Sequence, residues 1–259
     1  MSTLFVGDWV GEFGWEVCAW NGYVRKYVQE NFFDRVVVGI RAGHQLLYDD
    51  FASGYRIHSM TGKQSIVHLN GKIPVAEFDG EEVSYLRPTL EVCTGAAFDI
   101  SKQVPRKFGV SVEDRFDILI NARNRGVRPD YNWPTDNWNK LVEAVPGVRI
   151  GSVGSMGQSL HIEGTVDLRD TPLKDLADLM TSAKVLLSPS SGVAVFSSFC
   201  GCPHIVWCDA AKRYGGKTIE ERFNTYWNPF NTENSVLTEK GFQPDVSTVF
   251  TAISERGYL

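Results

Sequence analysis

The stretch KVLLSPSSGVAVFSSFCGCPHIVWCD, residues 184–209, contains the pattern that decides the fold. Its beginning, 184–190, is an apolar run of the length of a buried strand, and a second such run follows at 203–209. Between them, residues 192–201 are predicted as an apolar helix that opens on small residues. A strand, a helix and a strand in this order predict parallel pairing through a right-handed crossover.

The same alternation continues on both sides of this stretch, in the C-terminal half of the chain. Apolar runs of strand length alternate there with segments of helical periodicity. The predicted strands are 116–122 and 149–154, and the predicted helices are 135–145 with Thr135 as its N-cap, 172–183 and 246–256.

The N-terminal half has a similar organisation. Its predicted strands are 3–7, 35–40 and 55–60, and its predicted helices are 13–31 and 44–52. Residues 61–100 are less regular, with short strands expected at 65–69 and 83–88. The polar stretch 101–114, which contains Pro105 and Gly109, is the predicted linker.

Two such halves predict an α/β protein with two Rossmann-like parallel-sheet domains that face a central cleft. The expected domains are residues 1–112 and 113–259. Ligands of open parallel sheets bind at the carboxyl ends of the strands, and clefts between domains are common small-molecule sites. The loops after the strands are therefore the first places to look for functional residues.

Composition and charge exclude several classes of protein. The net charge of the 259 residues is −5 and is spread over both halves, so no basic tail or domain suits non-specific binding of nucleic acid. The five scattered cysteines predict buried thiols in a reducing cytoplasm, not a disulfide framework. The start has no signal-peptide pattern, and the longest apolar stretch, 193–207, is too interrupted to span a membrane.

A loop of small polar residues follows the predicted strand 184–190. Ser190, Ser191 and Gly192 open the next helix, where free backbone N–H groups and the positive end of the helix dipole favour an anion. This turn suits a phosphate or pyrophosphate. Capping of the helix by serine explains the same residues equally well, so both interpretations stay open.

Three arginines follow the predicted strand 116–122. Arg123, Arg125 and Arg128 would lie at the same carboxyl edge of the sheet, and guanidinium groups pair well with phosphate oxygens. Arg123 and Arg125 are nearest to the strand and are the first candidates for donor binding. The alternative is a solvated basic loop.

The loop after the first strand offers carboxylates beside two tryptophans. Asp8, Glu12 or Glu16 could deprotonate a hydroxyl as a general base, and Trp9 and Trp15 are candidates for contact with an acceptor. Acidic residues also favour helix N-termini for electrostatic reasons alone, and tryptophan is at least as often a core residue.

Several other kinds of site are disfavoured by the sequence. The histidines and cysteines show no metal-ligand spacing, so no metal site is predicted. No strand is followed by GxGxxG and a later acidic residue, which disfavours a dehydrogenase, and the GxSxG pattern of hydrolases is absent.

Three stretches, taken together, resemble a known family. The arginine loop leads to WPTDNW (133–138), VDLRDTPL (166–173) precedes an apolar helix, and Ser190-Ser191-Gly192 leads to Gly201-Cys202-Pro203. Their order and spacing over residues 116–210 resemble the donor domain of the heptosyltransferase-like glycosyltransferases, glycosyltransferase family nine. Ser190 stands where the family has Asp and Val195 where it has His, so donor specificity is not carried over.

The resemblance implies a GT-B fold and a hexosyl- or pentosyltransferase that is inverting and metal-independent. The C-terminal domain would bind a nucleoside-diphosphate sugar, with Ser190, Ser191 and Gly192 on the pyrophosphate. The N-terminal domain would bind the acceptor and supply the base, for which Glu12 is the first candidate and Asp8 the alternative. The nucleotide-sugar is a co-substrate, and no other cofactor is expected.

Two alternatives remain open. The acceptor could be a hydroxylated base in viral DNA instead of a glycan, with Lys102, Arg106 and Lys107 as backbone contacts. The chain could also be a non-catalytic module that binds a nucleotide or sugar. The sequence does not decide the sugar, the nucleotide or the oligomeric state.

Overall fold

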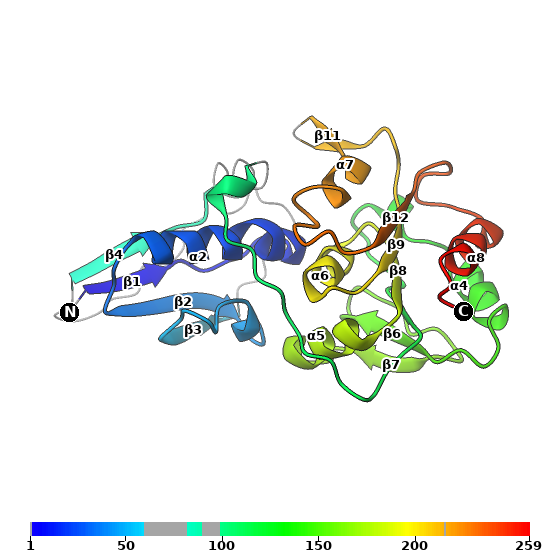
Figure 1. Cartoon of the computed structure of the whole chain (residues 1–259), viewed down its shortest axis with the longest axis horizontal. Coiled ribbons are helices and arrows are strands. Elements are labelled where there is room, and N and C mark those ends of the chain that lie inside the picture. The colour runs from blue at the N-terminus through cyan, green and yellow to red at the C-terminus, as the bar shows by residue number, and fades with distance from the viewer. Residues whose placement is uncertain (1, 60–81, 90–98, 215) are drawn as a thin grey trace. The chain divides into compact units, whose positions relative to one another are not determined.

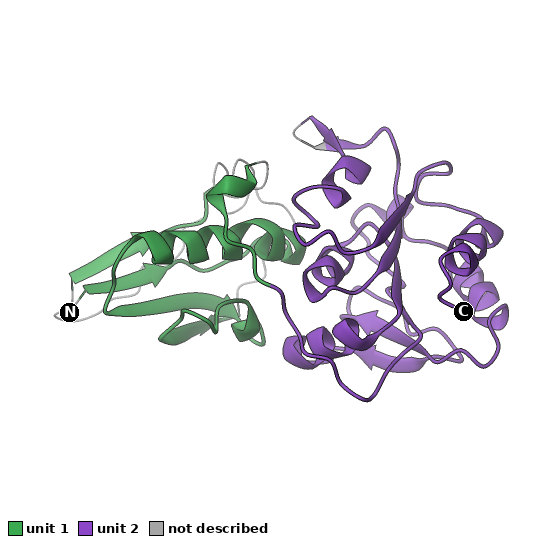
Figure 2. Cartoon of the chain, viewed as in Figure 1, with its two compact units in different colours: residues 1–106 green, residues 107–259 purple. Residues whose placement is uncertain are grey.

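The computed structural model describes residues 2–59, 82–89, 99–214 and 216–259. The chain divides into two compact units, Met1–Arg106 (unit 1) and Lys107–Leu259 (unit 2), shown in Figure 2. The division falls within the stretch 101–114. No helix of the described residues is long and apolar enough to cross a membrane.

Unit 1 is built on a parallel sheet of four strands in the order β3-β2-β1-β4. The strands are β1 (Ser2–Val6), β2 (Arg35–Arg41), β3 (Gly54–His58) and β4 (Glu82–Leu86). β1 and β2 are almost continuously buried, as their apolar runs predict. The expected strand 65–69 lies outside the described residues.

The first helical segment of unit 1 is interrupted by a π-helical turn. It consists of α1 (Phe13–Trp15), the π turn η1 (Glu16–Trp20) and α2 (Asn21–Glu30), which together match the predicted helix 13–31. The predicted helix 44–52 is instead a short 3₁₀ turn, η2 (Gln45–Leu47), and a second such turn, η5 (Ile100–Lys102), follows later. The π turn matters for the site, because such turns re-aim side chains and often lie at functional positions.

Unit 2 contains a parallel sheet of six strands in the order β12-β9-β8-β5-β6-β7 (Figure 1). The strands are β5 (Ile118–Ile120), β6 (Ile150–Gly154), β7 (Val166–Arg169), β8 (Val185–Pro189), β9 (His204–Trp207) and β12 (Asn234–Leu237). A hairpin of β10 (Arg213–Tyr214) and β11 (Lys217–Thr218) lies outside this sheet.

Helices cover both faces of the unit 2 sheet. Figure 1 shows α4 (Thr135–Glu143) and α8 (Val246–Glu255) on one side, and α5 (Leu173–Ser182) and α6 (Gly192–Cys200) on the other. The shorter η6 (Pro129–Tyr131) and α7 (Ile219–Phe223) lie in connections. The N-cap of α4 is Pro134, not the predicted Thr135, which is the first helical residue.

Most tryptophans are core residues. Trp133, Trp138 of α4 and Trp207 of β9 pack together with ring centroids 4.8 to 5.4 Å apart, in a core cluster that also includes residues of α8. In unit 1, Trp9 and Trp20 are completely buried and stacked. The high tryptophan content therefore reflects packing more than exposed sugar-binding faces.

The strand order of unit 2 reverses between β5 and β8. From β5 the chain builds β6 and β7 on one side, then returns to place β8, β9 and β12 on the other. β5 and β8 are neighbours, with Ile120 opposite Leu187. In sheets of this order, the carboxyl ends at the reversal form a crevice that binds ligands.

Candidate functional site

The serine loop lies at this reversal point, directly after β8. Ser191 is the N-cap of α6, and its Oγ accepts a hydrogen bond from the backbone N of Ala194 at 3.2 Å. Ser190, Ser191 and Gly192 are all half-buried. Capping is therefore present, and the N-terminus of α6 opens at the carboxyl edge of the sheet, where its dipole favours an anion.

Asn121 joins the serine loop to the end of β5. Its amide nitrogen donates to Val153 O at 3.0 Å and to Ser159 Oγ at 2.9 Å. Its amide oxygen accepts from Ser188 Oγ at 3.3 Å and from Ser191 Oγ at 3.1 Å. This buried side chain thus fixes the ends of β5, β6 and β8 relative to one another.

Arg123 is buried inside the arginine loop, residues 123–128, and holds it through hydrogen bonds. It is only 5% exposed, and its guanidinium donates to Val127 O at 2.7 Å, to Arg128 O at 3.0 Å and to Asn132 Oδ1. Burial, together with the positive charges of Arg125 and Arg128, lowers the pKa of Arg123 to about 10. Because these cations repel one another, a bound anion would relieve the repulsion.

The arginine loop and the segment after β9 place cations around Tyr131. The guanidinium carbons of Arg123 and Arg128 lie 5.5 and 5.7 Å from its ring centroid, and Lys212 Nζ lies at 5.5 Å. The ring of Phe242 stacks on Tyr131, with ring centroids 3.6 Å apart. Sequence reasoning missed Lys212, which follows β9 and adds a fourth cation to the three arginines.

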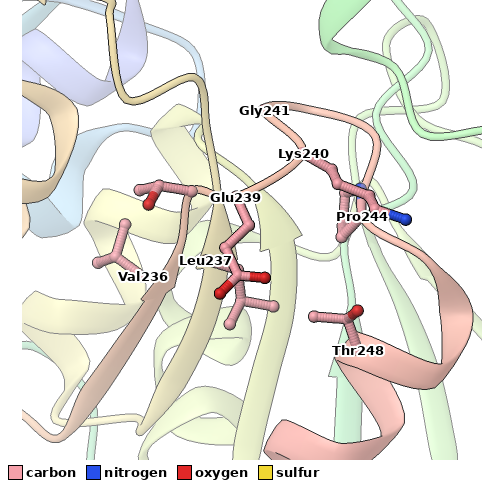
Figure 3. Close-up of a pocket in the computed structure, with 8 residues that line it drawn as sticks. Val236, Leu237, Glu239, Lys240, Gly241, Pro244 and Thr248 are labelled. Atoms are coloured by element: carbon pink, nitrogen blue, oxygen red, sulfur yellow. The ribbon is translucent and has the colours of Figure 1, made fainter.

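A separate pocket of about 200 Å³ lies where β12 ends and α8 begins (Figure 3). Leu237, Thr238, Glu239, Pro244 and Thr248 contribute to its walls. None of the sequence-predicted site residues lines it. Among the residues that the structure describes, no group of three His, Cys, Asp or Glu side chains is placed to hold a metal ion.

In unit 1, Asp8 is a completely buried carboxylate. Its Oδ2 accepts from Arg56 Nη2 at 2.7 Å. Its other oxygen lies against Gly39 of β2, where the absence of a side chain makes room for it. Asp8 therefore has a structural partner and is poorly placed to receive a proton from a substrate.

Glu12 and the two candidate tryptophans lie differently in the same loop. Glu12 precedes α1 and is half-buried, and Trp15 is also half-buried. Trp9 is part of the core, and its Nε1 donates to Glu12 O at 3.3 Å. Trp9 thus supports the backbone of the loop, while Glu12 and Trp15 keep part of their surface exposed.

Further polar residues converge at this edge of unit 1. Glu16, in η1, is buried and contacts His44 and Tyr48. Arg41, at the end of β2, donates to Gly11 O in the loop after β1. Next to Arg41 in the sheet is His58, the last residue of β3.

The charged residues of this cluster act on the pKa of His58. Burial lowers its pKa, while Asp8 and Glu16 act to raise it and Arg41 and Arg56 to lower it further. Its ring nitrogens are buried and have no hydrogen-bond partner among the described residues. Sequence reasoning missed this cluster because it tested the histidines only for metal-ligand spacing. The available signal was that His44 follows the predicted strand 35–40 and that His58 lies near the end of the predicted strand 55–60.

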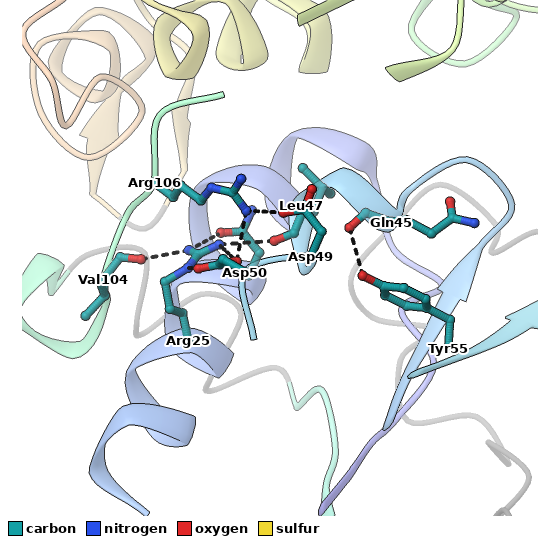
Figure 4. Close-up of polar contacts among 9 residues, drawn as sticks. Arg25, Gln45, Leu47, Asp49, Asp50, Tyr55, Val104 and Arg106 are labelled. Atoms are coloured by element: carbon teal, nitrogen blue, oxygen red, sulfur yellow. Dashed lines mark hydrogen bonds and ion pairs between the residues drawn. The ribbon is translucent and has the colours of Figure 1, made fainter. Parts of the chain in front are cut away.

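The basic residues considered for DNA contact have partners within their own units. Arg106 forms ion pairs with Asp49 and Asp50, and the neighbouring Arg25 also binds Asp50 (Figure 4). Lys102 Nζ lies 3.9 Å from Asp99 Oδ2, and Lys107 Nζ lies over the ring of Phe230. Two carboxylates thus offset the charge of Arg106.

Comparison with known proteins gives matches in structure but not in sequence. No protein-family model matches the chain, and no curated protein matches it. E. coli ADP-heptose LPS heptosyltransferase II is similar in structure, with a TM-score of 0.59 and 13% identity over 99% of each chain.

Two further solved structures are similar. For E. coli heptosyltransferase WaaC with ADP, the TM-score is 0.54 with 13% identity over 99% of this chain and 98% of that one. For a family 9 glycosyl transferase from Veillonella parvula, the TM-score is 0.56 with 9% identity over 100% of this chain and 90% of that one. At these identities the likeness shows the fold, and it confirms the predicted GT-B class of two parallel α/β units.

Proposed function

We propose that this chain, which has the fold of the heptosyltransferase-like glycosyltransferases, transfers a sugar from a nucleoside-diphosphate sugar to an acceptor hydroxyl. Unit 2 would bind the donor, and unit 1 would bind the acceptor and supply the base. The sugar would be a hexose or a pentose, and the transfer would be inverting.

One observation carries the proposal. The reversal point of the unit 2 sheet brings the N-terminus of α6 next to the end of β5, from which the arginine loop continues. Helix N-termini and arginine forks are two common binding elements for phosphate oxygens. Lys212, which lies over the ring of Tyr131 with Arg123 and Arg128, adds a further cation, and together these groups would suit a pyrophosphate.

The proposed step is a single displacement. The acceptor oxygen forms a bond to the anomeric carbon, and the bond between that carbon and the pyrophosphate oxygen breaks. Arg125, Arg128 and the N-terminus of α6 would stabilise the charge on the departing nucleoside diphosphate. These fixed positive groups support a reaction without a metal ion. Glu12 is the carboxylate candidate for the base, and the buried Asp8 is the weaker one.

The first test is a thermal-shift screen with nucleoside diphosphates, followed by their sugars. A ligand at a hundred times its Kd stabilises the native state by ~2.7 kcal/mol. We expect one nucleotide to raise Tm clearly, and the corresponding nucleotide-sugar to release nucleoside diphosphate when acceptors are added.

A matched pair of variants locates the site. Arg128→Ala should weaken the rise in Tm that the nucleotide causes, whereas Arg149→Ala should keep it. Arg149 is an exposed arginine directly before β6, and it forms an ion pair with Asp114. Absence of a response to every nucleotide would contradict the proposal. Nucleotide binding without turnover on glycans or hydroxylated DNA would favour a non-catalytic binding module.

A further inference from the structure

A buried carboxylate in unit 1 is bound to a histidine. Glu16 is completely buried, and its Oε2 lies 2.8 Å from His44 Nδ1. Its Oε1 accepts a hydrogen bond from the hydroxyl of Tyr48 at 3.1 Å. Burial and the nearby Glu16 raise the pKa of Tyr48 well above its ordinary value, so Tyr48 stays a neutral donor. Both oxygens of Glu16 therefore have defined partners.

His44 lies at the carboxyl edge of the unit 1 sheet. It follows β2 through a tight turn, in which Gly43 has a φ of 85° and His44 N donates to Arg41 O. The rings of His44 and Phe13 pack in a T-shaped arrangement with centroids 5.6 Å apart, which places His44 beside the residue that follows Glu12. The His44 side chain is bound to Glu16 and is 18% exposed, so solvent still reaches it.

The pairing with Glu16 decides which ring nitrogen can accept a proton. A carboxylate at Nδ1 favours the tautomer with hydrogen on Nδ1, which leaves a lone pair on Nε2. The same carboxylate stabilises the imidazolium that forms when Nε2 takes up a proton, as in histidine bases oriented by a buried acid.

We propose that His44, oriented by Glu16, is the general base of the sugar transfer. This inference rests on the proposed function. As the acceptor oxygen bonds to the anomeric carbon, its proton moves to His44 Nε2, and the nucleoside diphosphate leaves with the electron pair of the broken bond. The imidazolium then releases the proton to solvent. Glu12 would contact the acceptor without taking its proton.

The side-chain chemistry favours His44 over the carboxylates of the loop after β1. A general base works best when its pKa lies near the working pH, and imidazole meets this condition more closely than a carboxylate does. Among the described residues, the charged and titratable groups close to His44 or to its partner Glu16 include Tyr48 after η2, Arg41 at the end of β2 and His58 at the end of β3. Tyr48 donates to Glu16, the carbonyl of Arg41 accepts from His44 N, and His58 interacts electrostatically with Glu16 and Arg41.

The experiment compares His44→Gln, Glu16→Gln and Glu12→Gln, with His161→Gln as the control. His161 is an exposed histidine of unit 2, bound to Thr165 O. The probe is the nucleotide-sugar that raises Tm most in the wild-type screen, and the readout is release of nucleoside diphosphate between pH 5 and pH 9. Binding of the free nucleoside diphosphate is measured for each variant.

We expect His44→Gln to lower kcat by about 100-fold or more, in the range typical for loss of a general base. Nucleotide binding should be unchanged, and the acidic limb of the pH profile should disappear. Glu16→Gln should lower kcat less and move that limb, because the imidazolium loses its anionic partner. Added imidazole should partly restore turnover by His44→Ala, and His161→Gln should behave as wild type.

The competing results are distinct. If Glu12→Gln abolishes turnover while His44→Gln keeps it, the base is Glu12, and sugar transfer itself stands. If the wild type releases no nucleoside diphosphate from any nucleotide-sugar, the proposed function and this inference both fail. If the variants do not fold, the proposal is tested on the wild-type protein. The protonation of His44, followed by NMR, must then coincide with the acidic limb of the pH profile of turnover. A mismatch between the two overturns the proposal.

Discussion

Arg123 and Arg128 lie in the same loop but have different roles in the structure. Arg123 is buried and holds the loop through backbone carbonyls, whereas Arg128 is exposed and has a left-handed φ of 54°. The sequence presents them as equivalent members of one basic cluster. Arg123 holds the loop through three hydrogen bonds, whereas Arg128 lies over the ring of Tyr131, so their substitution should have different consequences.

We predict that Arg123→Ala weakens both folding and nucleotide binding. Loss of its hydrogen bonds should lower the free energy of unfolding of unit 2 by about 2 kcal/mol, and the misplaced loop should weaken nucleoside-diphosphate binding. Arg128→Ala should weaken binding with a smaller loss of stability, because it removes a contact with the ring of Tyr131 and none of the hydrogen bonds that Arg123 makes within the loop. Urea unfolding and calorimetric titration measure both quantities. Unaltered affinity in Arg123→Ala would exclude the loop from the donor site.

His204 should make the stability of unit 2 depend on pH. It is 1% exposed, and burial lowers its pKa to about 4. The unfolded chain takes up a proton near pH 6.5, but the folded chain does not until about pH 4. Stability is therefore complete above pH 6.5 and falls as the pH drops toward 4, by about 3 kcal/mol in total.

His204→Gln should remove this contribution to the pH dependence. Its free energy of unfolding, followed by denaturant titration at several pH values, should change less than that of the wild type between pH 6.5 and pH 4. His161→Gln provides the exposed control. An identical pH dependence in His204→Gln and wild type would show that other groups dominate this range.

At the scale of elements, the strongly apolar strands are predicted best. β1, β2, β8 and β9 all match predicted runs, because central parallel strands are buried on both faces. β7 and β12 were missed. They are the edge strands of the unit 2 sheet, and their sequences VDLR and NSVL remain partly exposed, so they carry no continuous apolar run.

Substitution of Gly39 in β2 tests the close packing between this strand and Asp8. A Cβ at this position of β2 would overlap the carboxylate of Asp8. Gly39→Ala should therefore destabilise unit 1 by about 1–3 kcal/mol, as overpacking typically does. Gly54→Ala in the neighbouring β3 is the matched control, because a Cβ there meets nothing within 4 Å. Equal Tm values for the two variants would contradict the close packing of Asp8.

At the scale of the whole molecule, the connection between the units is anchored within each unit. On the unit 1 side, Val104 N donates to Gly22 O and Arg25 binds Val104 O. On the unit 2 side, Phe108 N donates to Phe199 O and Val110 N to Asp178 Oδ1. Most of the predicted linker is therefore integrated into one unit or the other.

We predict that residues 107–259 fold as a separate domain and retain nucleoside-diphosphate affinity within a few-fold of the full chain. A fragment of residues 116–259 should have a lower Tm, because it lacks the anchored segment with Phe108, which packs on Phe196 and Phe199. Thermal unfolding and titration of both fragments provide the test. Equal stability of the two would show that the segment adds nothing to unit 2.

The sequence by itself determined the α/β class, the two-unit organisation and the loops that follow the central strands, because apolar periodicity reports local burial. The tertiary structure alone decided the strand order that places the serine loop beside β5. It also decided the pairing of Glu16 with His44 and of Asp8 with Arg56. Periodicity does not specify which strands become neighbours, so contacts between distant residues arise only when the sheet assembles.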